Sequence, residues 1–210
     1  IRGFRKISEM MTESIVENLK LILQRIESAC LKSNRNPSEV RLLLATKTVS
    51  ADHIKIAIEA GQTLIAENKV QEIKEKYESL KSIPHESHFI GNLQSNKIKD
   101  LLKCDISCIQ SLDRFDLAQK LHQRLLFENK TMNVLIQVNT SNEESKFGVH
   151  PDQAIEFIQQ VSALETLKIK GLMTIGLFSA ETEKVRKCFQ LLKGIQQKAI
   201  SLQIPNVEMK

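Results

Sequence analysis

The chain has 210 residues, of which 41% are hydrophobic and 26% are charged, a balance typical of a soluble globular protein and not of a disordered one. Its net charge of +5 is mild and no dense basic run is present, so nucleic-acid binding has no support. No stretch approaches the roughly 20 apolar residues of a membrane span, and the scattered cysteines fit a reducing compartment. We therefore expect a cytoplasmic protein with no nucleic-acid or membrane partner.

The N-terminal region contains an amphipathic helix. Residues 1–10 lack a clear hydrophobic period and precede Met11, so we expect them to be an upstream extension or added residues. Ser14 and Glu17 then have the spacing of a capping box, which predicts a helix start, and the helix is expected to end near Ser33. Its apolar residues recur at steps of three and four, at Ile15, Leu19, Ile22, Ile26 and Ala29.

The rest of the chain alternates strand and helix patterns. Residues 41–47 (RLLLATK) form a short apolar run, as expected for a strand buried on both faces of a parallel sheet. Ser50 suits the start of the next helix and Gly61 its end. Further strands are expected at residues 63–66, 88–90, 106–109, 133–139 and 168–175. Further helices are expected at residues 67–81, 95–103, 114–129, 151–164 and 180–202.

Repeated βα units predict a parallel α/β sheet, and this pattern alone leaves both a (β/α) barrel and an open doubly wound sheet possible. The first strand is followed by Thr48, Val49 and Ser50, so neither a dinucleotide-binding turn nor a P-loop is present. No linker-like composition divides the chain. Residues 11–210 are therefore expected to form a single domain.

Reactive groups in parallel α/β folds gather where strands end. Lys47 ends the first strand, where an amine held over the core would be desolvated and would condense with an aldehyde. From position alone, a lysine that reaches solvent is the commoner outcome. The other strand ends supply Glu67, Asn68, Gly91, Asn92, Ser111, Asn139 and Thr174. We expect these residues to form a polar ring around one mouth.

Motifs in a fixed order cover most of the chain: LLLATKTVSADHIKIAIEAGQTLIAENKVQE (42–72), HFIGNLQSNK (88–97), SLDR (111–114), NVLIQVNTSNEESKFG (133–148) and KGLMTIG (170–176). Together they resemble the YggS/PROSC family of pyridoxal phosphate homeostasis proteins. The resemblance implies a TIM-type (β/α) barrel related to the N-terminal domain of alanine racemase. It also implies pyridoxal 5'-phosphate (PLP) as cofactor, held as a Schiff base, and a non-catalytic role in balancing intracellular vitamin B6.

The resemblance assigns a role to particular residues. It makes Lys47 the Schiff-base lysine, places Asn68 close to the cofactor ring, and makes Met173 line the same mouth. Lys146 matches a family lysine near the pocket and would help to hand the cofactor on, although a solvated loop charge is the plain alternative. Asn68 also suits a helix cap. No catalytic residue and no metal ligand is expected.

Two departures from the family pattern affect the expected site. Lys69 stands where the family usually has an aromatic residue, which predicts a more polar rim. The family also continues beyond residues 207–210 into a seventh strand with a Ser-x-Gly-Met-Ser motif and an eighth with Arg-x-Gly-Thr. Those segments carry the family's phosphate-binding residues and the arginine that faces the pyridine nitrogen. We expect the sequence shown to lack these two strands; weaker PLP binding and a covering partner chain are the alternatives.

Other clusters predict structure and not chemistry. Cys104 and Cys108 bracket an expected strand and are expected to be buried apolar residues, not a redox pair. Residues 13–17 and 74–81 are charge-rich helix faces, which are expected to be solvated.

Two other functions stay open beside a PLP carrier. An amino-acid racemase of the alanine racemase type would use the same lysine and cofactor, with a tyrosine from a second domain as the other acid/base. The one tyrosine here, Tyr77, lies in an expected helix, so a two-base mechanism is hard to assemble. A binding module without PLP would use Lys47 for an anionic metabolite. We expect a mostly monomeric carrier with PLP-dependent apoenzymes as recipients.

Overall fold

The computed structural model describes residues 2–143 and 145–209, with side chains from residue 12 onward. Contacts divide the chain into two compact units. The first unit contains the residues up to Glu67 together with Gln71–Ser87. The second contains Asn68–Val70 and the residues from His88 onward. The expected single domain over residues 11–210 stays a prediction.

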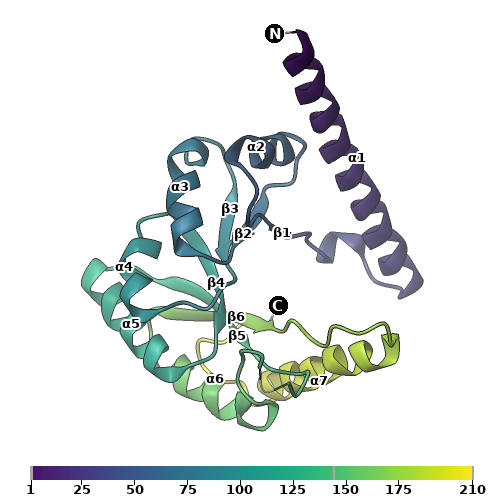
Figure 1. The fold of residues 1–210 in the computed structure, drawn as a ribbon. Coiled ribbons are helices and arrows are strands. Elements are labelled where there is room, and N and C mark those ends of the chain that lie inside the picture. The colour runs from purple at the N-terminus through teal and green to yellow at the C-terminus, as the bar shows by residue number, and fades with distance from the viewer. Residues whose placement is uncertain (1, 144, 210) are drawn as a thin grey trace. The chain divides into compact units, whose positions relative to one another are not determined.

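Parallel strands alternate with helices along the chain, as the repeated βα pattern predicts (Figure 1). Strand order follows chain order, β1-β2-β3-β4-β5-β6, and the β1–β2, β4–β5 and β5–β6 pairs are parallel. The strands are β1 (Leu44–Ala45), β2 (Leu64–Glu67), β3 (Glu86–Phe89), β4 (Ile106–Leu112), β5 (Met132–Gln137) and β6 (Leu167–Met173). This alternation places the carboxyl ends of neighbouring strands at the same edge of the sheet.

The first unit is held by a small apolar cluster between its helices and strands. Its helices are α1 (Arg2–Lys32), η1 (Pro37–Glu39), α2 (Ala51–Glu59) and most of α3 (Val70–Leu80). The buried members of the cluster are Ile54, Ile58, Ile65 and Leu80. As expected, Ser50 caps α2, because its Oγ accepts the His53 N–H at 3.5 Å.

Two expected boundaries in the first unit are wrong. Helix α1 is already formed from Arg2, so Ser14 and Glu17 lie inside a helix and do not mark its start. The chain has no proline before Pro37, which would break the helix, and the capping-box pair alone does not prevent the helix from extending back to Arg2. The expected strand over residues 41–47 is reduced to the two residues of β1.

The second unit has a larger core, built from near-continuous apolar strands. Ile109, Val134, Ile136 and Ile169, in β4 to β6, are all 0% exposed, as expected for strands covered on both faces. Helices lie along the outside of these strands (Figure 1). They are η2 (Ser95–Lys97), α4 (Ile98–Leu101), α5 (Phe115–Glu128), η3 (Pro151–Gln153), α6 (Ala154–Ser162) and α7 (Thr182–Ser201). No helix in the described part of the chain is long and apolar enough to cross a membrane.

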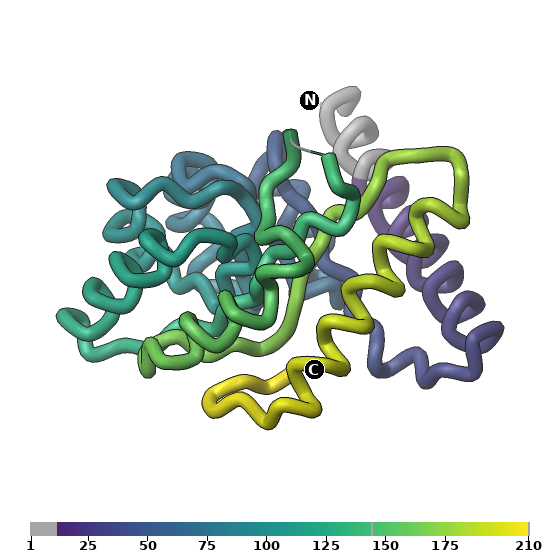
Figure 2. Tube along the Cα trace, turned by 90° about the horizontal axis from the view of Figure 1, so that it is seen from below, coloured from purple at the N-terminus to yellow at the C-terminus, as the bar shows by residue number. Residues whose placement is uncertain are grey.

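The segment that follows α7 turns back towards the strands, as the yellow end of the tube in Figure 2 shows. Val207 forms a parallel bridge with Ile169 of β6. The Glu208 N–H donates to the Ile169 carbonyl at 2.8 Å, and the Glu208 carboxylate pairs with Lys170 at 2.8 Å. Val207 and Glu208 therefore add backbone pairing to β6.

Gly91 lies very close to the backbone of Asn68 in the second unit. A Cβ built on Gly91 would lie 1.9 Å from the carbonyl oxygen of Asn68 and 2.6 Å from its carbonyl carbon. Backbone atoms cannot rotate away as a side chain can, so only glycine fits here without moving the chain.

Replacing Gly91 with alanine is therefore expected to lower the free energy of unfolding by about 1–3 kcal/mol or more, the usual cost of overpacking. Gly194→Ala is the matched control, because nothing lies within 4 Å of its Cβ position and Gly194 is inside α7. That variant should gain about 0.5–1 kcal/mol. Urea denaturation of both variants measures the two effects, and equal stabilities would contradict the close approach.

Candidate functional site

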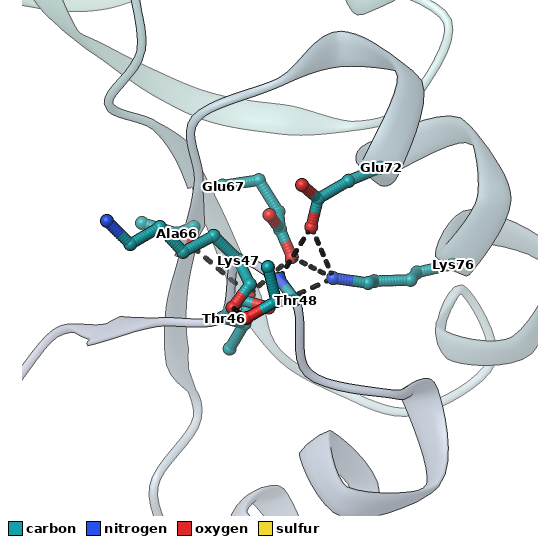
Figure 3. Close-up of polar contacts among 7 residues, drawn as sticks. All are labelled: Thr46, Lys47, Thr48, Ala66, Glu67, Glu72 and Lys76. Carbon is teal, nitrogen blue, oxygen red and sulfur yellow. Dashed lines mark hydrogen bonds and ion pairs between the residues drawn. The ribbon is translucent and has the colours of Figure 1, made fainter.

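Lys47 lies on a turn just after β1 in the first unit. Thr46, before it, is buried, and its N–H donates to the Ala66 carbonyl at 2.8 Å. Lys47 itself is exposed, the outcome that its position alone favoured, and is not enclosed over the core. Figure 3 shows its side chain extending away from the charged groups that surround the turn. The position combines a firmly held backbone with an accessible amine.

A buried group of charges lies beside this turn. The Lys76 Nζ lies 2.5 Å from Glu67 Oε1 and 3.2 Å from Glu72 Oε2, and it donates to the Thr46 carbonyl at 2.9 Å. The side chain of Lys76 is 13% exposed and that of Glu67 is 4% exposed. Glu67 Oε1 also accepts the Thr46 hydroxyl at 2.7 Å. Buried charges need such partners, because solvent no longer stabilises them.

Thr48, after Lys47, has an unusual backbone conformation. Its φ is 64°, in the left-handed region that β-branched residues rarely adopt. The Thr48 N–H donates to Glu72 Oε2 at 2.8 Å, and its hydroxyl donates to the Lys47 carbonyl at 2.6 Å. Local strain of this kind persists where surrounding contacts hold it.

The sequence pattern missed the part that α3 plays here. The face at residues 74–81 was expected to be solvated, which is wrong for Lys76. The i,i+4 spacing of Glu72 and Lys76 was a visible signal, but it is the same for a surface ion pair. Their burial follows from Glu67 at the end of β2, a tertiary neighbour that helix periodicity does not reveal.

In the second unit, contacts connect the ends of successive strands. The Gly91 carbonyl, after β3, accepts a hydrogen bond of 2.5 Å from the hydroxyl of Ser111, which lies near the end of β4. Thr140, after β5, contacts the Thr174 hydroxyl after β6 at 2.8 Å. Together with the approach of Gly91 to Asn68, these contacts join neighbouring strand ends within this unit, and the expected polar ring stays a prediction.

Asn68 has an unpartnered polar atom. Its Oδ1 is buried and accepts no hydrogen bond from the described residues. The alternative role as a helix cap is therefore wrong: α3 begins at Val70, and no backbone N–H of that helix reaches this oxygen. A buried amide oxygen without a donor is rare in proteins and marks a place where a ligand group or water can bind.

Lys146 lies in the loop that follows β5, and Met173 lies at the end of β6. The Lys146 Nζ donates to the Gly176 carbonyl at 2.7 Å and pairs with the Glu143 carboxylate. Its side chain is 24% exposed, so the alternative of a freely solvated loop charge is wrong. Met173 is the last residue of β6 and is half-buried.

The four expected site residues fall in two groups. Asn68, Lys146 and Met173 belong to the second unit, and Lys47 belongs to the first. Their convergence on one mouth stays a prediction. The rim residue Lys69 is exposed. Cys104 and Cys108 are buried free cysteines, as expected.

Asp113 joins the end of β4 to the loop that carries Lys146. Its carboxylate accepts the Gly148 N–H at 3.1 Å and an Arg114 N–H at 3.1 Å, and its side chain is 8% exposed. Burial raises the pKa of Asp113 above 3.8, and this effect outweighs the lowering by Arg114 and by the Gly148 N–H.

A raised pKa in the folded chain means that the folded state binds this proton more tightly than the unfolded state. The stability contributed by Asp113 is therefore full below pH 3.8 and is lost as the pH rises through the folded pKa. We expect the stability of the native chain, measured relative to Asp113→Asn, to fall as the pH rises above 3.8 and through the folded pKa of Asp113. Urea denaturation across this pH range tests the expected fall in stability. Asp152→Asn is the control, because the Asp152 side chain is 90% exposed. A difference that is constant, or that rises with pH, would contradict the assignment.

Comparisons with known proteins agree with this architecture. Residues 18–209 match the family described as alanine racemase, N-terminal domain. The pyridoxal phosphate homeostasis protein of Aquifex aeolicus is 37% identical over 196 residues, which are 92% of this chain and 86% of the relative. The protein of the same name from Haemophilus influenzae is 39% identical over 202 residues, 93% of this chain and 85% of the relative.

Solved structures give the same result. A protein of unknown function from Bifidobacterium adolescentis has a TM-score of 0.88 at 32% identity, covering 94% of this chain and 83% of that one. PipY of Synechococcus elongatus PCC7942, in its structure with PLP bound, has a TM-score of 0.69 at 29% identity, covering 93% and 85%. The expected relation to the alanine racemase N-terminal fold is therefore confirmed, and the chain belongs to the alanine racemase N-terminal domain family, among the pyridoxal phosphate homeostasis proteins.

Proposed function

We propose that this protein binds PLP as a Schiff base on Lys47 and takes part in PLP homeostasis as a carrier. The observation that carries the proposal is its similarity, over 93% of the chain, to a PipY structure that has PLP bound. The names of its relatives from Aquifex aeolicus and Haemophilus influenzae support the same role.

The described residues fit such a group. Lys47 offers an exposed amine on a fixed turn. Asn68 offers a buried side-chain oxygen, Oδ1, that accepts no hydrogen bond from the described residues. Beside it, Gly91 leaves no room for a further side chain. We assign Asn68 to the cofactor ring, Met173 to the same mouth and Lys146 to transfer of the cofactor.

The chemistry required of Lys47 is reversible. PLP would supply an aldehyde there, with which the Lys47 amine would condense with release of one water. Addition of water, or of an amine from a recipient protein, reverses this step and frees Lys47. An exposed amine suits such exchange, because water and a recipient can both reach it.

We infer a carrier and not a racemase from the acid/base groups. A racemase needs a second group on the other side of the substrate. Tyr77, the one tyrosine in the chain, lies within α3 and is half-buried. We further propose that the protein works as a monomer in the cytoplasm and supplies PLP-dependent apoenzymes; its four buried free cysteines suit a reducing compartment.

Lys47→Ala is expected to abolish the visible absorbance that PLP gives when it is bound as a Schiff base, because no amine remains at this position. Lys55→Ala is the control, since Lys55 is a partly exposed lysine of α2 in the same unit. Absorbance after PLP addition and removal of free PLP measures the difference. A native chain that stays colourless, or a Lys47→Ala chain that stays coloured, would defeat the proposal. Alanine racemisation above background that Lys47→Ala abolishes would favour the enzyme.

A further inference from the structure

We propose that Glu72 and Lys76 are positioning residues for Lys47: one turn of α3 fixes the peptide group on each side of it. This inference rests on the proposed function of Lys47. Each contact that carries it lies within the first unit and is drawn in Figure 3.

The peptide group before Lys47 is held by Lys76. The Lys76 Nζ donates to the Thr46 carbonyl at 2.9 Å, and its other neighbours are Glu67 Oε1 at 2.5 Å and Glu72 Oε2 at 3.2 Å. An ammonium group has three donors, and here each has an oxygen acceptor. Lys76 is thus held in place by two carboxylates while it binds the turn.

The peptide group after Lys47 is held by Glu72. Its Oε2 accepts the Thr48 N–H at 2.8 Å. A hydrogen bond to a carboxylate is stronger than one to a neutral acceptor. It therefore opposes the tendency of Thr48, a β-branched residue with a φ of 64°, to leave the left-handed region.

Because the peptide groups on both sides of Lys47 are bound, the direction in which its side chain leaves the backbone is fixed. The direction of a Cα–Cβ bond is set by the backbone, and the backbone at Lys47 is bound at Thr46 and at Thr48. Glu72 and Lys76 are i,i+4 neighbours, so they share one face of the helix. A reactive group held in advance loses less conformational freedom when it binds its partner.

Glu72→Ala is the sharper single variant, because it removes the acceptor of the Thr48 N–H and leaves Lys76 with Glu67 and the Thr46 carbonyl. We expect the dissociation constant for PLP to rise about tenfold or more, the loss that accompanies removal of a charged hydrogen bond. The visible circular dichroism of bound PLP should weaken, since it reports a fixed orientation. Glu78→Ala is the matched control, because Glu78 lies on the same helix in an exposed pair with Lys81.

A second measurement needs no cofactor. The Thr48 amide of the chain without PLP should exchange its hydrogen faster in Glu72→Ala than in Glu78→Ala, as followed by NMR. Adding Thr48→Asn to Glu72→Ala should recover part of the PLP affinity, because asparagine adopts the left-handed conformation more readily than threonine. A residue that only stabilises the fold would not give this rescue.

Lys76 is tested with both buried charges removed. Glu67→Gln combined with Lys76→Met avoids leaving a buried carboxylate unpaired, which alone could prevent folding. This pair of changes should also weaken PLP binding about tenfold, because the Thr46 carbonyl loses its donor.

The outcomes separate the two proposals. A native chain that forms no coloured complex with PLP overturns the proposed function. A native chain that binds PLP, with Glu72→Ala matching Glu78→Ala in PLP affinity and in Thr48 amide exchange, overturns the positioning role of Glu72. Native-like affinity in the Glu67→Gln/Lys76→Met chain overturns that of Lys76.

Discussion

The ammonium group of Lys76 connects three elements around one turn of the first unit. It bonds to Glu67 at the end of β2, to Glu72 one helical turn earlier in α3, and to the carbonyl of Thr46 after β1. Glu67 is nearly inaccessible, and its second oxygen has no hydrogen-bond partner among the described residues. Its negative charge therefore depends on Lys76 and on the Thr46 hydroxyl. Burying such an ion pair costs desolvation free energy, but the pair can favour one local structure over others.

Close backbone contacts join strand ends within the second unit. Gly91 allows the backbone of Asn68 to approach, and Gly148 does the same for Asn139, with 2.6 Å between its Cβ position and the Asn139 nitrogen. Hydroxyl groups and the Asp113 carboxylate complete the connections.

Much of the fold followed from local pattern, because buried parallel strands are apolar runs and their helices have a strong period. All six expected strands exist, although Arg41–Lys47 shrank to Leu44–Ala45. Thr46 bonds to charged side chains of other elements, through its hydroxyl to Glu67 and through its carbonyl to Lys76, which a periodic pattern does not show. The capping-box signal at Ser14 failed because two residues at the right spacing do not interrupt a helix whose neighbours also favour it.

The candidate site was predictable in part. Lys47 could be selected because it ends an apolar strand within an ordered set of motifs, and its position alone also favoured its exposure. Lys76 looked like one charge of a solvated face, since burial depends on Glu67 of another element. The Asn68 side-chain oxygen is unpartnered because no donor among the described residues reaches it, and sequence spacing does not reveal this.

The central claim concerns one covalent position, and borohydride reduction followed by tryptic mapping tests it directly. Reduction of the complex with PLP turns a Schiff base into a stable amine, and trypsin does not cleave after a modified lysine. The account predicts that the adduct appears on peptide 42–55, uncleaved after Lys47. An adduct confined to another lysine, or no adduct at all, would contradict it.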